Sequence, residues 1–188
     1  MNNRKNRIII LCMVIFMVYM FYFIDGNKYA LYKQIAGKKF VATSGLGTSA
    51  TEITVDEKGN ITGVAYDLDV GCNDKSYPNG TWYYCEFEGK FSEPQKINDH
   101  MYKCRISKLN YLSPIGKDEI KDGYLYSYQK PRSMGTEKDV IIYTPRTPMS
   151  EISQKIKYWL WWRLKESIDT VELPNYVISI EEMGYMCE

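Results

Sequence analysis

The segment from Thr81 to Phe91 alternates between apolar and charged side chains at every second residue. In an extended chain the two kinds point to opposite sides, with Tyr83, Cys85, Phe87 and Phe91 on one and Glu86, Glu88 and Lys90 on the other. A strand with this pattern packs one face on a core and turns the other to water, as antiparallel sheets commonly do. The sequence therefore predicts a β-rich fold.

Other segments carry the same signal. Two β-favouring runs, 51–55 and 61–66, flank the turn 56–60 and predict a hairpin. A further alternating run begins at Tyr102, and its apolar phase slips near Ser107-Lys108, which predicts a β-bulge. Three shorter strands are predicted at Tyr124–Tyr128, Val140–Tyr143 and Tyr176–Ile180. Short strands between turns favour a mainly β fold, an antiparallel meander that forms a small barrel or sandwich.

One amphipathic helix is predicted before the last strand. Thr147 is expected to cap it, and Pro148 suits its first turn. Its apolar stripe at helical spacing comprises Ile152, Ile156, Trp159, Leu160 and Leu164. We expect this stripe, with Trp159 as a core residue, to cover an open side or end of the sheet.

The chain begins with basic residues and a long uncharged run. Arg4, Lys5 and Arg7 precede residues 8–24, a run of 17 residues that is at the short end of what a helix needs to cross a bilayer. Basic residues before the run, with none directly after it, predict a cytoplasmic N-terminus. The predicted organisation is a cytoplasmic segment 1–7, a single-pass transmembrane anchor 8–24, a stalk 25–37 and an extracellular β-rich domain 38–188.

A cleaved signal peptide and a peripheral helix are the alternative interpretations of this N-terminus. Cleavage requires small residues at positions −3 and −1 of the site. Ala30 has Lys28 at its −3 position, and Ala36 has Gln34. The sequence therefore favours an uncleaved anchor in the cell membrane.

Charge limits the partners of the domain. The chain has 24 Lys and Arg residues, three of which precede the apolar run, and 23 Asp and Glu residues. The domain is therefore nearly neutral, whereas a nucleic-acid partner requires a basic face. The predicted partners are the lipid bilayer, through residues 8–24, and an envelope protein or glycan, with no nucleic acid.

Four of the five cysteines lie outside the apolar run, and an extracellular location permits disulfides between them. Cys85 and Cys104 both fall on predicted core faces. If the intervening turn lies at Pro94-Gln95, the two are opposite each other and can form a disulfide. If it lies at Asn98-Asp99, Cys85 is opposite Ser113 and the pairing fails.

The middle of the chain resembles a known family. The residues that carry the resemblance are Phe40, Ser44–Gly47, Thr51–Thr54, Gly59, Gly63, Asp67, Tyr77–Thr81 and Cys85–Phe91, with YPNGT…CxFxGKF as the most specific part. In these residues the chain resembles uncharacterised cell-surface and lipoprotein-like proteins of low-GC Gram-positive bacteria, over roughly residues 38–150. The resemblance implies exposure outside the cytoplasm and no assigned activity.

Two groups of side chains are candidate sites. Asp67, Asp69 and Asp74 lie within eight residues, and such oxygens can bind calcium, although in turns they more often bond their own backbone. Tyr124, Tyr126 and Tyr128 share one strand face and, with Trp161 opposite the helix stripe, form a candidate interaction surface for a sugar or a protein.

Catalytic motifs are scarce. His100 is the only histidine, no GxSxG motif occurs, and no catalytic or cofactor-binding residue is assigned. The predicted function is a membrane-anchored, non-enzymatic binding or interaction module. The alternatives are a lipocalin-like barrel that carries a small apolar ligand, and an envelope hydrolase that uses a pair of carboxylates.

Overall fold

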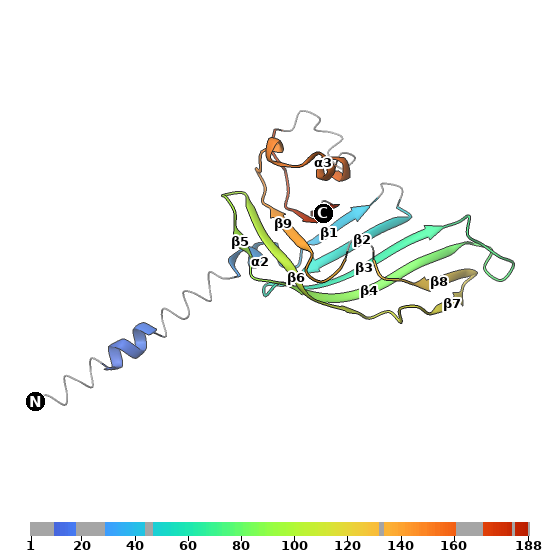
Figure 1. Cartoon of the computed structure of the whole chain (residues 1–188), viewed down its shortest axis with the longest axis horizontal. Helices are drawn as coiled ribbons and strands as arrows, with labels where there is room; N and C mark the ends of the chain where they lie inside the picture. The colour runs from blue at the N-terminus through green and yellow to red at the C-terminus, as the bar shows by residue number, and fades with distance from the viewer. Residues whose placement is uncertain are drawn as a thin grey trace, which may run out of the picture.

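The computed structural model describes residues 10–17, 29–43, 47–131, 134–160, 171–181 and 183–187. Eight antiparallel strands close into a barrel, in which each strand pairs with the next around the circle and the last pairs with the first. In this order they are β1 (Lys39–Thr43), β2 (Ser49–Val55), β3 (Asn60–Asp69), β4 (Thr81–Phe91), β6 (Met101–Tyr111), β9 (Asp139–Tyr143), β10 (Val177–Ile180) and β11 (Met183–Cys187). Figure 1 shows β3 and β4 as the long, curved strands of this barrel. The predicted meander and barrel are confirmed, and the sandwich alternative is wrong.

Three short strands lie outside the circle. β5 (Gln95–Lys96) extends the edge of β6, and the hairpin of β7 (Asp118–Lys121) and β8 (Tyr124–Tyr128) attaches to β4. β8 pairs with β4 in parallel orientation, whereas only antiparallel strands were predicted. The parallel orientation arises because the chain turns through β7 before β8 reaches β4.

The predicted β-bulge is confirmed at the closure of the barrel. Lys90 pairs with Lys108 while Phe91 pairs with Ile106, so Ser107 is the extra residue of β6. Its hydroxyl donates to the carbonyl of Lys90 at 3.0 Å. A bulge increases the local twist, and this one lies close to the point where the pairing of β6 with β9, along Met101–Arg105, gives way to its pairing with β4 on the other edge, from Ile106 onward.

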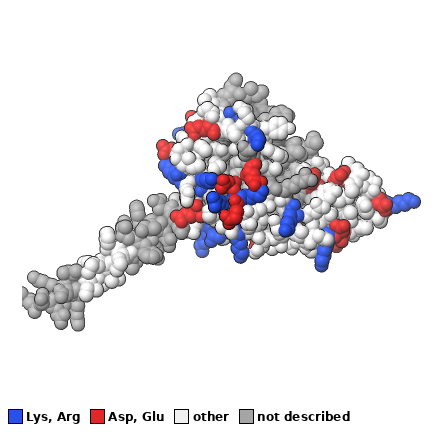
Figure 2. Space-filling view, viewed as in Figure 1, with Lys and Arg blue, Asp and Glu red and all other residues white. Residues whose placement is uncertain are grey.

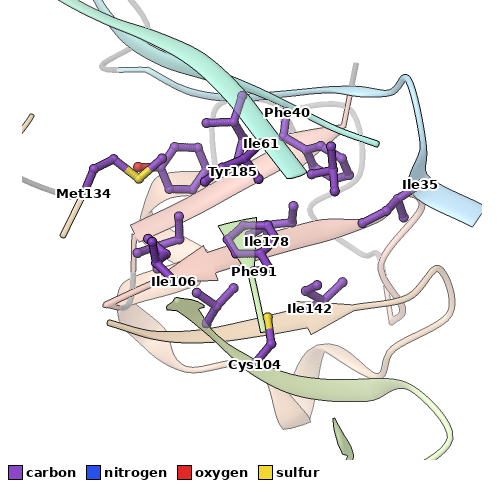
Figure 3. Close-up of a cluster of buried hydrophobic side chains, with 14 of the residues drawn as sticks. Ile35, Phe40, Ile61, Phe91, Cys104, Ile106, Met134, Ile142, Ile178 and Tyr185 are labelled. Atoms are coloured by element: carbon purple, nitrogen blue, oxygen red, sulfur yellow. The ribbon is translucent and has the colours of Figure 1, made fainter. Parts of the chain in front are cut away.

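Large side chains fill the barrel interior. Phe40 of β1, Phe87 and Phe91 of β4 and Tyr185 of β11 each have 1 % or less of their surface exposed. Figure 3 shows Phe91, Ile106 and Ile178 pointing toward one another in this core. Burial of this apolar surface is the main favourable contribution to folding.

A short helix closes one end of the barrel. Leu31, Tyr32 and Ile35 of α2 (Ala30–Ile35) are buried in the barrel core. The Tyr32 ring stacks on Phe91 at 6.2 Å, and its hydroxyl donates to the carbonyl of Ser92 at 2.6 Å. The predicted stalk 25–37 is therefore wrong in its second half, because the apolar residues of α2 belong to the folded domain.

The predicted amphipathic helix begins later than expected and precedes a hairpin of two strands. The 3-10 turn η1 (Met149–Glu151) comes first, Ile152 is extended, and α3 (Gln154–Leu160) follows. Thr147 does not cap the helix, since its buried hydroxyl donates to the carbonyl of Thr144 at 2.7 Å. Ser153 accepts from the amide of Ile156 instead.

α3 packs on the outer face of the barrel. Ile152, Ile156 and Leu160 are buried there against Val177 and Met186. Trp159 is only half-buried, so its prediction as a core residue is wrong. The reason is that only the side of α3 that faces β10 and β11 is buried, and Trp159 lies at the border of that side.

The two candidate cysteines lie in the register that prevents their pairing. Phe87 pairs with Tyr111, which puts Cys85 level with Ser113, and the amide of Glu86 donates to the Ser113 hydroxyl at 2.8 Å. Cys104 pairs with Val140. Both thiols are free and buried, so the predicted disulfide between Cys85 and Cys104 is not formed.

Only part of the apolar N-terminal run belongs to the described residues, and residues 8, 9 and 18–24 lie outside them. Residues 10–17 are helical, and their large apolar side chains are 46 to 64 % exposed. No helix within the described ranges has the length and apolar character needed to cross a membrane.

Substitution of Gly59 tests the closure of the barrel by α2. Gly59 has φ +78°, and a Cβ there would lie 2.5 Å from the Tyr32 ring. We expect Gly59→Ala to lower the free energy of unfolding by about 2–4 kcal/mol, through backbone strain and overpacking. Gly37→Ala is the control, because Gly37 has φ +73° with open space around it, and should cost only about 1 kcal/mol. Urea unfolding measures both, and equal losses contradict the packing of Tyr32.

Alkylation tests the cysteine environment. Burial raises the pKa of Cys85 to about 11 and that of Cys104 to about 12. Both are thiols at pH 8, and since the thiolate is the reactive form, iodoacetamide should label exposed Cys72 and leave these two unmodified in the native protein. After unfolding without reductant, both should become labelled. Mass spectrometry distinguishes the sites, and a missing label after unfolding contradicts the free thiols.

Candidate functional site

The three tyrosines of β8 lie on one face of the sheet, as predicted, and pack against the first half of β4. The ring centroids of Trp82 and Tyr124 are 6.2 Å apart, and Tyr84 lies 6.2 Å from Tyr126 and 6.4 Å from Tyr128. Tyr66 of β3 adds a contact with Trp82 at 5.9 Å. We call this group the aromatic face; its members are Tyr66, Trp82, Tyr84, Tyr124, Tyr126 and Tyr128.

The rings of the aromatic face are held at defined angles. Tyr84 meets Tyr126 and Tyr128 edge-on, at 75° and 77°, and Tyr66 meets Trp82 at 71°. Aromatic pairs favour this arrangement, because the positive edge of one ring meets the negative face of another. All six side chains remain partly exposed. The face therefore offers rings that are ordered before any partner arrives.

Carboxylates lie among these rings. The hydroxyl of Tyr84 donates to Glu86 at 2.7 Å, and that of Tyr128 donates to Glu119 at 3.0 Å. Burial and the bond to Glu86 raise the pKa of Tyr84, and the bond to Glu119 is the largest cause of the raised pKa of Tyr128. Both tyrosines are therefore neutral donors over the ordinary pH range, and each fixes a carboxylate on the aromatic face.

The β3–β4 loop holds the β7–β8 hairpin in position. Asp122 and Gly123 have φ of 53° and 79°, the positive values that a type I′ hairpin turn requires. Asn79 binds this turn through two hydrogen bonds. Its backbone N–H donates to the carbonyl of Gly123 at 3.0 Å, and its side-chain Nδ2 donates to the carbonyl of Asp122 at 3.2 Å. Thr81, which is buried, donates to the carbonyl of Cys72 at 2.7 Å. The YPNGT stretch thus has a structural role.

The other side of the same strands borders an open cleft of about 900 Å³. Residues Thr81–Tyr84 of β4 pair with β8 and not with β6, so they lie beyond the closed part of the barrel. Tyr83, which was predicted as a core residue, is therefore half-buried and lines the cleft. The lining residues are Ser49, Ala50, Thr51, Ala65, Tyr66, Asp67, Leu68, Asp69, Val70, Tyr83, Gln129, Lys130, Pro131, Trp159 and Met183.

The candidate calcium ligands do not converge. Oδ1 of Asp69 accepts from the amides of Gly71 and Cys72, at 2.8 and 3.2 Å. Oδ1 of Asp74 accepts from Ser76, and Asp67 lies on β3. Among the described residues no three His, Cys, Asp or Glu side chains are grouped so as to hold a metal ion. Asp69 and Asp74 instead cap local turns.

Three of the six residues of the aromatic face, Tyr66, Trp82 and Tyr84, were not predicted from the sequence as interaction residues. Trp82 and Tyr84 fall on the same side of β4 as Glu86 and Glu88, so aromatic residues on the water side of the clearest strand were the available signal. The contact with β8 was not visible, because it joins segments 40 residues apart. Trp161, the fourth predicted interaction residue, lies outside the described residues.

The surface charges do not separate by sign. Figure 2 shows Lys and Arg interspersed with Asp and Glu on the face that it displays. Lys103 and Arg105 of β6, for example, contact Asp139 at 2.9 and 3.5 Å.

Comparison of the chain with protein family models, curated proteins and solved structures gives no match. The resemblance to the cell-surface family therefore stays a prediction.

Asn79 provides a test of how the aromatic face is held. Asn79→Ala removes the side-chain bond to the β7–β8 turn and should destabilise the hairpin by about 1 kcal/mol. We expect faster amide hydrogen exchange in β8, while β1 and β11 keep their protection. Asn73→Ala is the control, since within the described part of the chain the Asn73 side chain donates to the carbonyl of Val70 in its own loop and does not contact the hairpin turn. Equal exchange in the two variants would contradict this role for Asn79.

Proposed function

We propose that this protein is a membrane-anchored, extracellular binding module, and that it contacts a protein partner through the aromatic face. The observation that carries the proposal is the cluster of six partly exposed aromatic side chains over β3, β4 and β8. Tyrosine and tryptophan dominate the energetics of protein interfaces, because each brings a large contact area with few rotatable bonds.

Preorganisation supports this assignment. Binding a flexible surface costs entropy when its side chains are immobilised. Here the mutual ring contacts and the bonds of Tyr84 and Tyr128 to carboxylates restrict the side chains in advance. Glu86 and Glu119 also give the face acceptors for donor groups of the partner, which adds direction to apolar contact.

The position of the aromatic face fits an anchored domain. α2 closes the barrel next to Gly59, which directly precedes β3, whereas Tyr66 of β3 lies seven residues further along the chain, roughly 23 Å away. Figure 1 shows β8, which carries three of these tyrosines, at the end of the barrel away from α2, the helix that follows the N-terminal segment. The exposed apolar side chains of residues 10–17 are unfavourable in water and favour a lipid environment for this segment.

The barrel interior favours an interaction module over a carrier of small apolar ligands. Such a carrier needs an apolar chamber inside the barrel. Here Phe40, Phe87, Phe91 and Tyr185 occupy the interior, and the cleft at the open end carries Asp67 and other polar groups.

Site-specific crosslinking in intact cells tests the proposal. A photoreactive phenylalanine analogue replaces Tyr126 in one version of the full chain and exposed Lys58, in the turn beside Gly59, in the other. We expect one discrete protein adduct from position 126 and none from position 58. Adding Trp82→Ser should reduce the yield at position 126 at least tenfold, because the rings lose a packing neighbour.

Two outcomes contradict the proposal. Equal adduct yields from positions 126 and 58 indicate random collisions. An unchanged yield with Trp82→Ser shows that adduct formation does not depend on the aromatic face. Circular dichroism checks that the Trp82 variant remains folded. Protease added to intact cells provides the control for location, since a surface domain should be cleaved while a cytoplasmic protein survives.

A further inference from the structure

The cleft on the opposite side of the sheet from most of the aromatic face combines carboxylates with aromatic rings. Asp67 and Asp69 of β3 line it, together with Tyr83 of β4 and Trp159 of α3. Its volume of about 900 Å³ falls in the range typical of small-molecule sites. Its aromatic lining residues, Tyr66, Tyr83 and Trp159, come from three different elements, so the cleft exists only in the folded barrel.

Among the described residues that line the cleft, two are carboxylates, Asp67 and Asp69, and one is basic. Lys130 is the basic residue among the lining side chains that the structure describes, and its Nζ lies 5.3 Å from the centre of the Tyr111 ring. Oδ1 of Asp69 is occupied by two backbone amides. Asp67 is exposed, and its carboxylate makes no hydrogen bond or ion pair with any described residue. The cleft therefore has an available negative charge.

The electrostatics at Tyr83 agree with this charge balance. The pKa of Tyr83 is raised, first by the charge of the neighbouring Cys72 sulfur, next by burial and the hydrogen bond to Cys72, and to a smaller extent by the carboxylates of Asp69 and Asp67. The carboxylates thus act on a ring inside the cleft. A cation near them gains both ion-pair attraction and attraction to the ring faces.

We propose that the cleft binds a small organic cation, an alkylammonium group on a short polar body. The ammonium would lie near Asp67 and against Tyr83 and Trp159, where carboxylate and ring attraction add. Ser49, Thr51 and Gln129 supply hydrogen-bonding groups for the polar body. Lys130 on Tyr111 shows the same pairing of ammonium and ring within the chain itself.

Choline and its uncharged isostere 3,3-dimethylbutan-1-ol test the proposal on the full chain. The readout is the indole N–H signal of Trp159 in the NMR spectrum, assigned by its loss in Trp159→Phe. We expect choline to shift this signal with a dissociation constant on the order of 1 mM, and the isostere to bind at least tenfold more weakly. Asp67→Asn should weaken choline binding roughly fivefold, and Lys130→Met should strengthen it.

Three results overturn the proposal: no shift at roughly 20 mM choline, equal binding of the isostere, or unchanged affinity in Asp67→Asn. Circular dichroism confirms that each variant is folded. The matched control is Glu88→Gln, an exposed carboxylate on the outer side of β4, which should leave choline binding unchanged. Tyr128→Ser, which disturbs the aromatic face at a ring that contacts Tyr84 and does not line the cleft, should also leave choline binding unchanged, so this test and the crosslinking test fail independently.

Discussion

The pairing of β4 with β6 is the constraint on which the rest of the molecule depends. It closes eight strands into a barrel, and it involves only the second half of β4, from Phe87 to Phe91. The first half is then free to pair with another strand, and β8 takes that place in parallel orientation. One long strand therefore belongs to the barrel at one end and to an open extension at the other. Both candidate sites lie on that extension.

The two ends of the barrel are built differently. At one end α2 inserts Leu31, Tyr32 and Ile35 into the core, and Gly59 leaves room for the Tyr32 ring. At the other end the strands continue past the core, so their inner face lines a polar cleft and their outer face carries aromatic rings. Tyr66 contacts Trp82 and also lines the cleft, which makes it the residue shared by the two sites. Stability and recognition thus occupy separate parts of one sheet.

Local patterns predicted β2, β3, β4, β6, β8, β9 and β10, because each of these strands shows its faces through its own sequence, whereas the barrel strands β1 and β11 were not predicted. The hairpin of β2 and β3, the bulge at Ser107 and the tyrosine row of β8 were all predictable from neighbouring residues. The errors came from contacts between distant segments. Thr147 was predicted to cap the helix, but its buried hydroxyl donates to the carbonyls of Thr144 and His100. The residues of α2 were predicted as part of a stalk, but their apolar side chains fill one end of the barrel.

The sequence by itself determined most of the strands, most of their buried faces and the presence of an apolar N-terminal run, because side-chain periodicity records these features locally. Only the tertiary structure decided between the two registers of Cys85 and Cys104, since a turn a few residues away shifts every pair along a hairpin. It also brought Trp82 and Tyr84 to the tyrosines of β8, and Trp159 to the cleft. Alternation gives the face of a strand, whereas the partner of that face depends on how the barrel closes.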